Sequence, residues 1–469
     1  MIFACFKFTK IANRFFFRLI LPTMLSGSFT NLLCTGGLAL FLLNSGLTAQ
    51  GLFTPTLSNS WQATFSNPAL YTQLEGALTV GLPGVSNRLD LGDFTYNDIV
   101  VEEGGERILD LNLLADQVSG RNFIGNEFNV ETLGFAYHGE RFGVGISHRF
   151  RSRGQLDFPV RLVEVLANGN AQFIGQTIDI APYLRATNYH EFALGMSFAA
   201  SEKVHFGARI KYLSGVADLR INPDQTLLLT TAERGYAITL NQNTVVNTSG
   251  AVAYNGFDDF GVDYDFGDAQ LDQLFTGNSG LAADIGVFVD LDGIRLQAAV
   301  TDLGASINWD EAPQNYVFFG ESSFDGLDVL TDLFDDNFSI DGAVDSLLEE
   351  FDPTETLNPY SGGVGARFMA AAEVDLTDKW TLAGSFLYSD QLIKDRLGVS
   401  AGARYQVLEQ WSVGAYYNFW GTDYTNLGVQ LYGGIGPLRV LASTDDLLTV
   451  FRPRDSSSVG GRVGFAIGF

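Results

Sequence analysis

The chain has 469 residues, a formal net charge of −26 and a hydrophobic fraction of 46%, with 52 Gly, 38 Phe and 12 Pro. An acidic protein of this size repels nucleic acid, so we exclude nucleic acid as a partner. Both cysteines, Cys5 and Cys34, lie in a segment that we expect to be removed, which excludes disulfides, zinc thiolate sites and cysteine nucleophiles from the mature chain.

Residues 1–50 are predicted to form a secretory signal peptide. Only four charged residues precede residue 51, and all are basic: Lys7, Lys10, Arg14 and Arg18. An apolar stretch over 32–47 leads to a small-residue cleavage site near Ala49 or Gln50, so removal takes the formal charge from −26 to −30. A start at Met24 and a retained membrane anchor remain alternatives. No later window has the unbroken apolar run of a spanning helix.

The mature chain is dominated by segments of alternating apolar and polar residues, which predict β-strands. We expect fourteen of them: 75–82, 129–138, 141–150, 190–200, 203–215, 281–291, 294–303, 362–376, 379–390, 396–407, 410–420, 425–434, 437–444 and 459–469. The even number fits an outer-membrane barrel with both termini in the periplasm. Two further strand-like pieces, 225–232 and 235–241, lengthen a neighbouring hairpin or raise the count to sixteen.

The segment 203–213 shows which face meets lipid. Val204, Phe206, Ala208, Ile210 and Tyr212 share one face, and the opposite face carries His205, Arg209 and Lys211. A charge on the lipid face of a barrel costs about 2–4 kcal/mol at the bilayer midplane, so the charged face lines the lumen. Closure also satisfies every backbone group without water. The predicted fold class is therefore all-β, a transmembrane antiparallel β-barrel with a short N-terminal luminal segment.

Very short turns alternate with long connections along the chain. The long ones are 83–128, 151–189, 216–280, 304–361 and 445–458, and we expect them on the extracellular side. Within the fourth, helical spacing predicts a short helix over 343–351. We find no sign of an appended domain, so residues 51–469 are expected to form one barrel domain.

The last eleven residues end an alternating strand on an aromatic side chain. Val463, Phe465, Ile467 and Phe469 point one way, and small residues with Arg462 point the other. This resembles the terminal signal by which outer-membrane β-barrels are recognised for insertion. It implies the outer membrane as location, its lipid and the barrel-assembly machinery as partners, and Phe469 as the assembly signal.

Further segments carry a family resemblance. Ser66-Asn67-Pro68-Ala69-Leu70 resembles a short segment near the mature N-terminus of FadL-type channels for hydrophobic compounds. Residues 189–215, Gly169-Asn170 and Asp445-Asp446-Leu447 are similar to a Bacteroidetes outer-membrane family, domain of unknown function 5723. The family more often has Asp-Asn at the Asp445-Asp446 step. The resemblance implies a barrel of the FadL-like superfamily and supplies no ligand.

Catalytic and metal sites are not indicated. Ser147 and His148 are adjacent in a strand, so they face opposite sides and cannot pair as nucleophile and base. The acidic loop 258–268 carries five Asp that could hold calcium, but the EF-hand spacing fails there and again at 337–348. A solvated surface loop is the favoured interpretation. We expect no enzyme activity, no cofactor and no metal.

Charged side chains on the predicted lumen face form the remaining candidate site: Arg149, Arg209, Lys211, Asp284, Arg295, Arg367 and Arg404. A fourteen-strand interior is too wide to be packed by strand side chains alone, so a plug is required. Residues 51–74 or an inward loop would supply it. Asn67, Pro68 and Ala69 are the luminal gate candidates, because Pro fixes one backbone angle and Asn can cap a local turn. Structural ion pairs in a closed barrel and a gated passage both remain open.

Two functional hypotheses follow. The first is passive uptake of a small hydrophobic or amphipathic compound, motivated by Asn67-Pro68-Ala69 and the apolar-rich loops. The second is a non-transport role as a surface scaffold or as an accessory of a secretion or attachment system, motivated by the large acidic loops.

Overall fold

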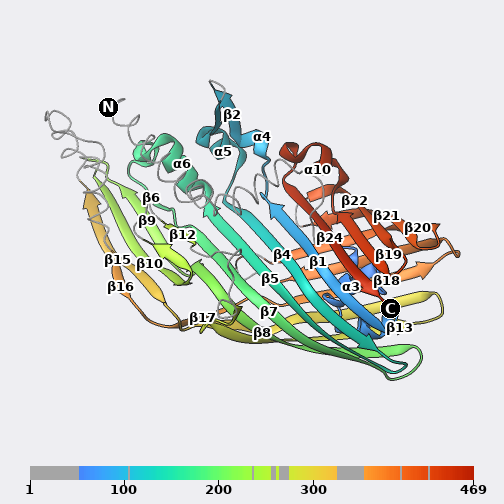
Figure 1. Ribbon diagram of the computed structural model, residues 1–469. Coiled ribbons are helices and arrows are strands. Elements are labelled where there is room, and N and C mark those ends of the chain that lie inside the picture. The colour runs from blue at the N-terminus through green and yellow to red at the C-terminus, as the bar shows by residue number, and fades with distance from the viewer. Residues whose placement is uncertain are drawn as a thin grey trace.

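The computed structural model describes residues 52–103, 106–234, 237–254, 260–262, 274–324, 353–390, 393, 395–420 and 423–469. These residues build a closed barrel of fourteen antiparallel strands, as predicted (Figure 1). In order around the barrel the strands are β1 (Leu78–Asp90), β4 (Arg121–His138), β5 (Phe142–Pro159), β7 (Tyr183–Ala199), β8 (Val204–Ile221), β13 (Ser279–Asp290), β14 (Ile294–Trp309), β18 (Arg367–Asp375), β19 (Trp380–Ser389), β20 (Arg396–Leu408), β21 (Trp411–Trp420), β22 (Asp423–Ile435), β23 (Leu438–Thr444) and β24 (Ser458–Gly468).

The barrel closes between its first and last strands. β1 pairs with β24 from Thr79–Gly468 to Asp90–Ser458, and its other edge pairs with β4. The terminal residue Phe469 continues this seam, because its amide donates to the Leu78 carbonyl at 2.8 Å. No helix among the described residues is long and apolar enough to cross a membrane.

Alternation along the strands follows the predicted faces. In β8, Phe206 and Ile210 are 53% and 65% exposed on the outside, whereas Arg209 and Lys211 are each 1% exposed and point inward. The same pattern gives β13 an exposed Leu281 and Ile285 and a buried Asp284. A lumen row of charges therefore lies behind an outward-facing apolar row, which is the arrangement of transmembrane barrels.

Several strands are longer than predicted at the end where the long connections lie. β1 continues through Pro83 to Asp90 because a register shift between Leu82 and Val85 accommodates the proline, which cannot donate to the ladder. β5 continues from residue 150 to Pro159. The predicted strand 362–376 is two strands, since β17 (Tyr360–Gly363) ends before β18 begins, and Gly365 between them has φ +83°.

An outer sheet extends the wall beyond the barrel at the long-connection end. It contains β6 (Thr177–Asp179), β9 (Thr226–Thr231), β10 (Ile238–Gly250), β15 (Gln314–Phe324) and β16 (Thr354–Thr356). β10 joins it to the barrel by pairing with residues 217–221 of β8. The strand-like piece 225–232 and the described part of the piece 235–241, residues 237–241, therefore lie in this extension (Figure 1, left), and the barrel count stays at fourteen.

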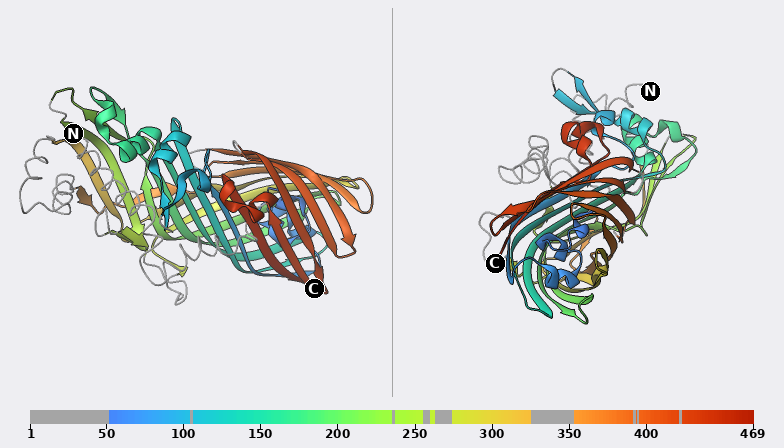
Figure 2. Two further views of the ribbon diagram at one scale, coloured as in Figure 1. Left: turned by 90° about the horizontal axis from the view of Figure 1, so that it is seen from above. Right: turned by 90° about the vertical axis from the view of Figure 1, so that its right-hand side faces the viewer.

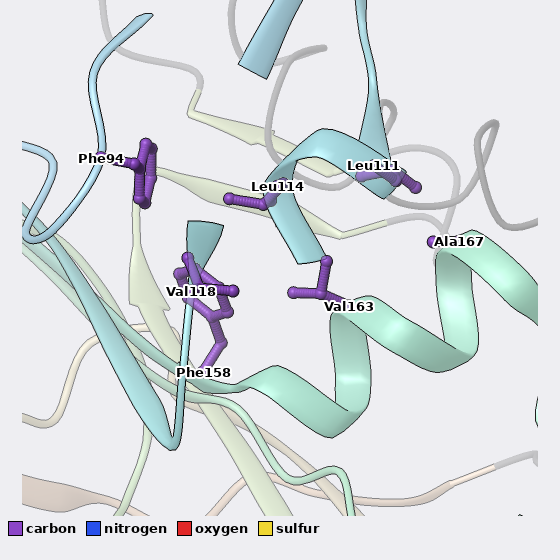
Figure 3. Close-up of a cluster of buried hydrophobic side chains, with 7 residues drawn as sticks. All are labelled: Phe94, Leu111, Leu114, Val118, Phe158, Val163 and Ala167. Atoms are coloured by element: carbon purple, nitrogen blue, oxygen red, sulfur yellow. The ribbon is translucent and has the colours of Figure 1, made fainter. Parts of the chain in front are cut away.

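A group of short elements with its own apolar core (Figure 3), called the cap below, lies at the upper ends of the strands in Figure 1. It comprises α4 (Tyr96–Ile99), the hairpin β2 (Val100–Glu103) and β3 (Glu106–Leu109), α5 (Leu111–Gln117) and α6 (Val160–Asn168). Its buried side chains are Phe94, Leu111, Leu114, Val118, Phe158, Val163 and Ala167. The sequence prediction had treated this part of the chain as loop.

Remaining short elements flank these regions. They are η5 (Asn170–Phe173), the hairpin β11 (Val252–Tyr254) and β12 (Phe260–Val262), α10 (Leu447–Phe451) and η6 (Pro453–Asp455). The helix predicted over 343–351 and most of the acidic loop 258–268 lie outside the described residues, as does the segment 337–348.

Candidate functional site

The N-terminal segment 52–74, called the plug below, lies inside the barrel. It forms η3 (Thr54–Thr56), α3 (Trp61–Thr64) and η4 (Pro68–Gln73), and the end-on view of Figure 2 shows α3 enclosed by strands. Ser60 caps α3 by accepting a hydrogen bond from the Ala63 amide at 3.2 Å. None of its 23 residues is charged or a histidine. The lumen is thus occupied by a neutral, largely buried piece of chain.

Glycines in the wall make room for the plug. A Cβ on Gly81 or Gly134 would lie 2.3 or 2.2 Å from the Trp61 ring, and a Cβ on Gly207 would lie 2.2 Å from the Ala69 amide nitrogen. Real atoms cannot approach this closely, so these positions accept only hydrogen as a side chain. The abundance of glycine in this chain is explained in part by the close fit between plug and wall at the short-turn end.

The three gate candidates Asn67, Pro68 and Ala69 stand together at the start of η4, and all are buried. Asn67 caps η4, because its Oδ1 accepts a hydrogen bond from the Ala69 amide at 2.9 Å. Its Nδ2 donates to the Val287 carbonyl at 3.0 Å and to Gln297 Oε1 at 3.1 Å. One side chain therefore shapes the plug and joins it to the wall.

Wall side chains bind the plug mainly through its backbone carbonyls. Arg209 donates to the Phe65 carbonyl at 2.9 Å, Arg404 to the Thr56 carbonyl at 2.6 Å, and Ser385 to the Leu52 carbonyl at 2.6 Å. The guanidinium of Arg149 also lies 4.5 Å from the centre of the Phe65 ring. These contacts hold the plug without a single charged group on the plug side.

Four of the predicted lumen charges join one buried network. Arg209 donates to Asp284 at 2.6 Å, and Lys211 lies 2.8 Å from the same carboxylate. Arg149 pairs with Glu191, whose other oxygen lies 2.7 Å from Arg151. Buried charges are tolerated only when paired in this way, because desolvation otherwise costs several kcal/mol per ion.

Asp302 links the two halves of this network, and the sequence prediction missed it. Its carboxylate lies 2.7 Å from Lys211 Nζ and 3.1 Å from Arg151 Nη1. Strict alternation after Thr301 would turn Asp302 toward lipid. A register shift opposite residues 283–285, with Asp302 at φ 60° and Gly304 at φ 64°, turns it inward instead. An Asp and a Gly two residues apart within a strand are the local signal for such a bulge.

The remaining predicted lumen charges divide between this network and a second place. Arg367 pairs with Glu127 at 2.5 Å, and Glu127 also lies 3.9 Å from Arg151, so Arg367 joins the network through Glu127. Arg295 and Arg404 share Glu373, at 3.1 and 2.9 Å, beside the plug. The structure therefore brings Arg149, Arg209, Lys211 and Asp284 together, adds Arg367 through Glu127, and leaves Arg295 and Arg404 apart.

A cavity of about 110 Å³ lies between the plug and the cap end of the lumen. Leu52, Pro55 and Phe65 of the plug form part of its wall, and Trp420 and Phe386 add further apolar surface. The rest of the wall is rich in arginine, including Arg151 and Arg153, which follow Arg149 on the inward face of β5. Prediction ended that strand at residue 150 and so missed both.

Asp445, just after β23, anchors the outer end of the plug. Its carboxylate accepts hydrogen bonds from the Leu52 amide at 3.2 Å and from Arg88 at 3.0 Å. Complete burial raises the pKa of this carboxyl to about 6, although the Arg88 cation opposes the shift. The neighbouring Asp446 instead caps α10 by accepting from the Leu448 amide at 2.9 Å.

Ser147 and His148 do not approach each other as a catalytic pair. His148 lies on the outer face, where its Nε2 is 3.1 Å from His190 Nδ1 and its ring is 4.5 Å from the Phe192 ring. Ser147 is 7% exposed on the opposite side of the strand. Both histidines lie among aromatic side chains, since the His190 ring is also 5.3 Å from the Phe150 ring.

Comparison with known proteins identifies a family without an assigned role. The sequence profile of the family of unknown function DUF5723 matches residues 68–445. No curated protein has significant sequence similarity to the chain.

Among solved structures, the toluene transporter TodX of Pseudomonas putida matches with a TM-score of 0.42 and 11% identity, over 90% of this chain and 99% of TodX. A FadL homologue of Pseudomonas aeruginosa matches with a TM-score of 0.40 and 12% identity, over 90% and 98%. The translocator domain of the autotransporter NalP of Neisseria meningitidis matches with a TM-score of 0.31 and 11% identity, over 84% and 88%.

Proposed function

This chain belongs to DUF5723, a family of unknown function, and we propose that its barrel is a gated passage for small hydrophobic or amphipathic compounds. The observation that carries this proposal is the plug: the lumen is filled by a segment with no charged residue. Asn67, Pro68 and Ala69 are proposed as its gate. The lumen charges are proposed to line the path.

A neutral plug is suited to movement. Its release breaks hydrogen bonds, such as those from Asn67 to Val287 and Gln297, and each is worth about 0.5–1.5 kcal/mol net. It breaks no ion pair, because every wall charge that contacts the plug keeps its own carboxylate partner, as Arg209 keeps Asp284 and Arg404 keeps Glu373. The wall can therefore stay folded while the plug shifts.

Apolar surface is available to a hydrophobic compound outside and inside. A groove of about 430 Å³ on the outer wall is lined by Leu133, Phe135, Ile146, Leu194 and Ile210. The inner cavity has Leu52, Phe386 and Trp420 on one side and charges on the other. Such a lining, apolar on one side and charged on the other, suits an amphipathic compound. We expect low, irregular bilayer conductance rather than an open ion pore.

The plug can be tested by two variants that loosen it in different ways. Replacing Asn67, Pro68 and Ala69 with serines removes the bonds that the Asn67 amide nitrogen donates to Val287 and Gln297, and it removes the backbone restraint of Pro68. Gly207→Val places a side chain where the Ala69 amide lies, so it should push η4 away from β8. Both should raise bilayer leakage and the uptake of hydrophobic probes by whole cells.

Gly139→Ala is the matched control, because a Cβ at Gly139, in a short turn away from the plug, would make only ordinary contacts, the nearest at 3.6 Å to the Phe142 ring. It should leave leakage and uptake as in the parent protein. If both plug variants assemble with normal heat-modifiable mobility but show unchanged conductance and unchanged uptake, the passage is wrong. The alternative, a surface scaffold or an accessory of a secretion or attachment system, then becomes the better explanation.

We further propose that the protein works in a Gram-negative outer membrane, in a Bacteroidetes host. The signal peptide over 1–50, the single barrel domain over 51–469 and insertion by the barrel-assembly machinery belong to this proposal. Phe469 is the proposed assembly signal, supported by its place at the β1–β24 seam. Deleting it should lower the amount of folded protein in the outer-membrane fraction. Normal assembly of the deletion variant would contradict this use of the C-terminus.

A further inference from the structure

The cavity above the plug has an unusual lining for a strongly acidic protein. Among the described residues around it, nine are basic and only Glu127 and Asp302 are acidic. The basic ones are Arg88, Arg149, Arg151, Arg153, Arg185, Lys211, Arg367, Arg396 and Arg462. The whole chain carries a formal charge of −26, so the local charge around this cavity has the opposite sign to the net charge of the protein.

Carboxylates behind the lining do not balance it. The acidic side chains that pair with this cluster are Asp90, Glu127, Glu131, Glu191, Asp284, Asp302 and Asp445, seven in all, against ten basic ones once Arg209 is included. Ten against seven, with Asp390 also acting on Arg185, leaves a formal excess of about two positive charges around the cavity. An uncompensated buried charge is costly, so a bound anion would stabilise the interior.

Three arginines carry the excess most clearly. Arg185 donates to the Gly363 carbonyl and forms no ion pair with a carboxylate of the described ranges. Arg153 reaches its carboxylates only at 3.5 Å (Asp302) and 3.6 Å (Glu127). Arg151 is 2% exposed, and its Nε–H has no hydrogen-bond partner in the part of the chain that the structure describes. The guanidinium groups of these three arginines therefore offer N–H donors to a ligand in the cavity.

The positions of the basic side chains around the cavity indicate which shape of anion would fit. They come from β1, β5, β7, β8, β18, β20 and β24, so they surround the cavity from half of the barrel wall. A planar carboxylate is matched by one guanidinium on one side, whereas a tetrahedral oxyanion accepts hydrogen bonds in all directions and can carry two charges. We propose that this cavity is a binding site for a small tetrahedral oxyanion of the phosphate class. The site goes beyond the proposed passage and does not depend on it.

Binding is measured on the purified, refolded barrel in detergent by calorimetry, with inorganic phosphate as the probe and chloride holding the ionic strength constant. We expect saturable binding of about one phosphate per chain. Arg185→Gln and Arg153→Gln should each weaken it at least about tenfold, because charge-assisted hydrogen bonds to an oxyanion are among the strong ones. Arg185→Lys, which keeps the charge, should weaken it less and serves if the glutamine variant does not fold.

Arg295→Gln is the matched control, since Arg295 also faces the lumen but pairs with Glu373 and Asp375 and does not line the cavity. It should leave phosphate binding unchanged. Phenyl phosphate and acetate complete the series. Tighter binding of phenyl phosphate than of phosphate would indicate a phosphate ester whose apolar part lies against Trp420, and weaker binding would indicate free phosphate.

Three results would overturn the site: no saturable phosphate binding, equal binding of acetate, or equal losses in Arg295→Gln and Arg185→Gln. The measurement involves neither a membrane nor passage through the barrel. A failure of the plug variants to leak therefore leaves this result standing, and a failure to bind phosphate leaves the gated passage standing.

Discussion

The two ends of the lumen are stabilised by different interactions. At the short-turn end, a neutral plug packs against wall glycines and is bound through its backbone, as by Arg209 and Ser385. Toward the long connections, the wall is held by buried ion pairs centred on Asp302 and Glu191. The comparison teaches that the stability of the wall and the blocking of the lumen depend on different contacts. The wall is stabilised by its own ion pairs, and the plug is held by weaker hydrogen bonds and packing.

The largest effect should come from breaking the wall network. Asp302→Ala leaves Lys211 and Arg151 buried without this partner, and losing one member of a buried pair costs about 3–5 kcal/mol. The urea midpoint of barrel unfolding should fall accordingly, with the plug still in place.

Asp310→Ala, at an exposed position just beyond the same strand, is the control and should change the midpoint little. A loss in Asp302→Ala no larger than in this control would mean that the wall does not depend on its ion pairs, and the contrast with the plug would disappear.

A smaller, pH-dependent effect is expected where wall and plug meet. Burial raises the pKa of Asp445 to about 6 from its ordinary 3.8, so the folded protein holds this proton more tightly than the unfolded chain does. Through this group, acidification should stabilise the barrel, by about 1 kcal/mol at about pH 5 and about 3 kcal/mol below pH 3.8. The gain is lost as the pH rises through 6.

Asp445→Asn cannot titrate, so its stability should lack this part of the pH dependence. The difference between parent and variant, followed by thermal unfolding from about pH 7.5 to about pH 4, isolates the contribution from that of other carboxylates. Parallel curves for the two proteins over this range would show that Asp445 is not the titrating group.

The smallest effect is expected from one contact of the plug. Ser385→Ala removes the hydrogen bond to the Leu52 carbonyl, and one such bond contributes about 1 kcal/mol. The variant should unfold almost as the parent does but exchange the amides of residues 52–57 faster, measured by hydrogen exchange. Ser400→Ala, a buried neighbour on β20, should leave those amides unchanged.

Sequence alone predicted the barrel because lipid imposes a strict alternation on every strand. Where that constraint applies, as in β8 and β21, the predicted faces of Arg209 and Val413 agree with their burial and exposure. The inward-facing charges were predicted for the same reason, because inward positions recur at every second residue of a strand.

Prediction failed where the membrane no longer imposes a pattern. β5 continues past residue 150, but Ser152 and Gly154 give it no apolar outer face, so Arg151 and Arg153 were read as loop. Asp302 was missed because a bulge turns its side chain inward, whereas strict alternation along the strand assigns this position to the outer face. The cap was missed because its apolar residues, such as Leu114 and Val163, come together only through contacts between distant segments.

The seam between β1 and β24 constrains the order in which the molecule can be assembled. The plug runs through Gly76 into β1, and Gly76 lies against the backbone of Phe469, the last residue of the chain. Closing the ring joins the earliest strand to the latest one. Because the plug is covalently continuous with β1, it joins the wall at the end of the barrel where Gly76 and Phe469 meet. Ring closure therefore requires the whole chain, and the plug is tethered beside the opening that this closure completes.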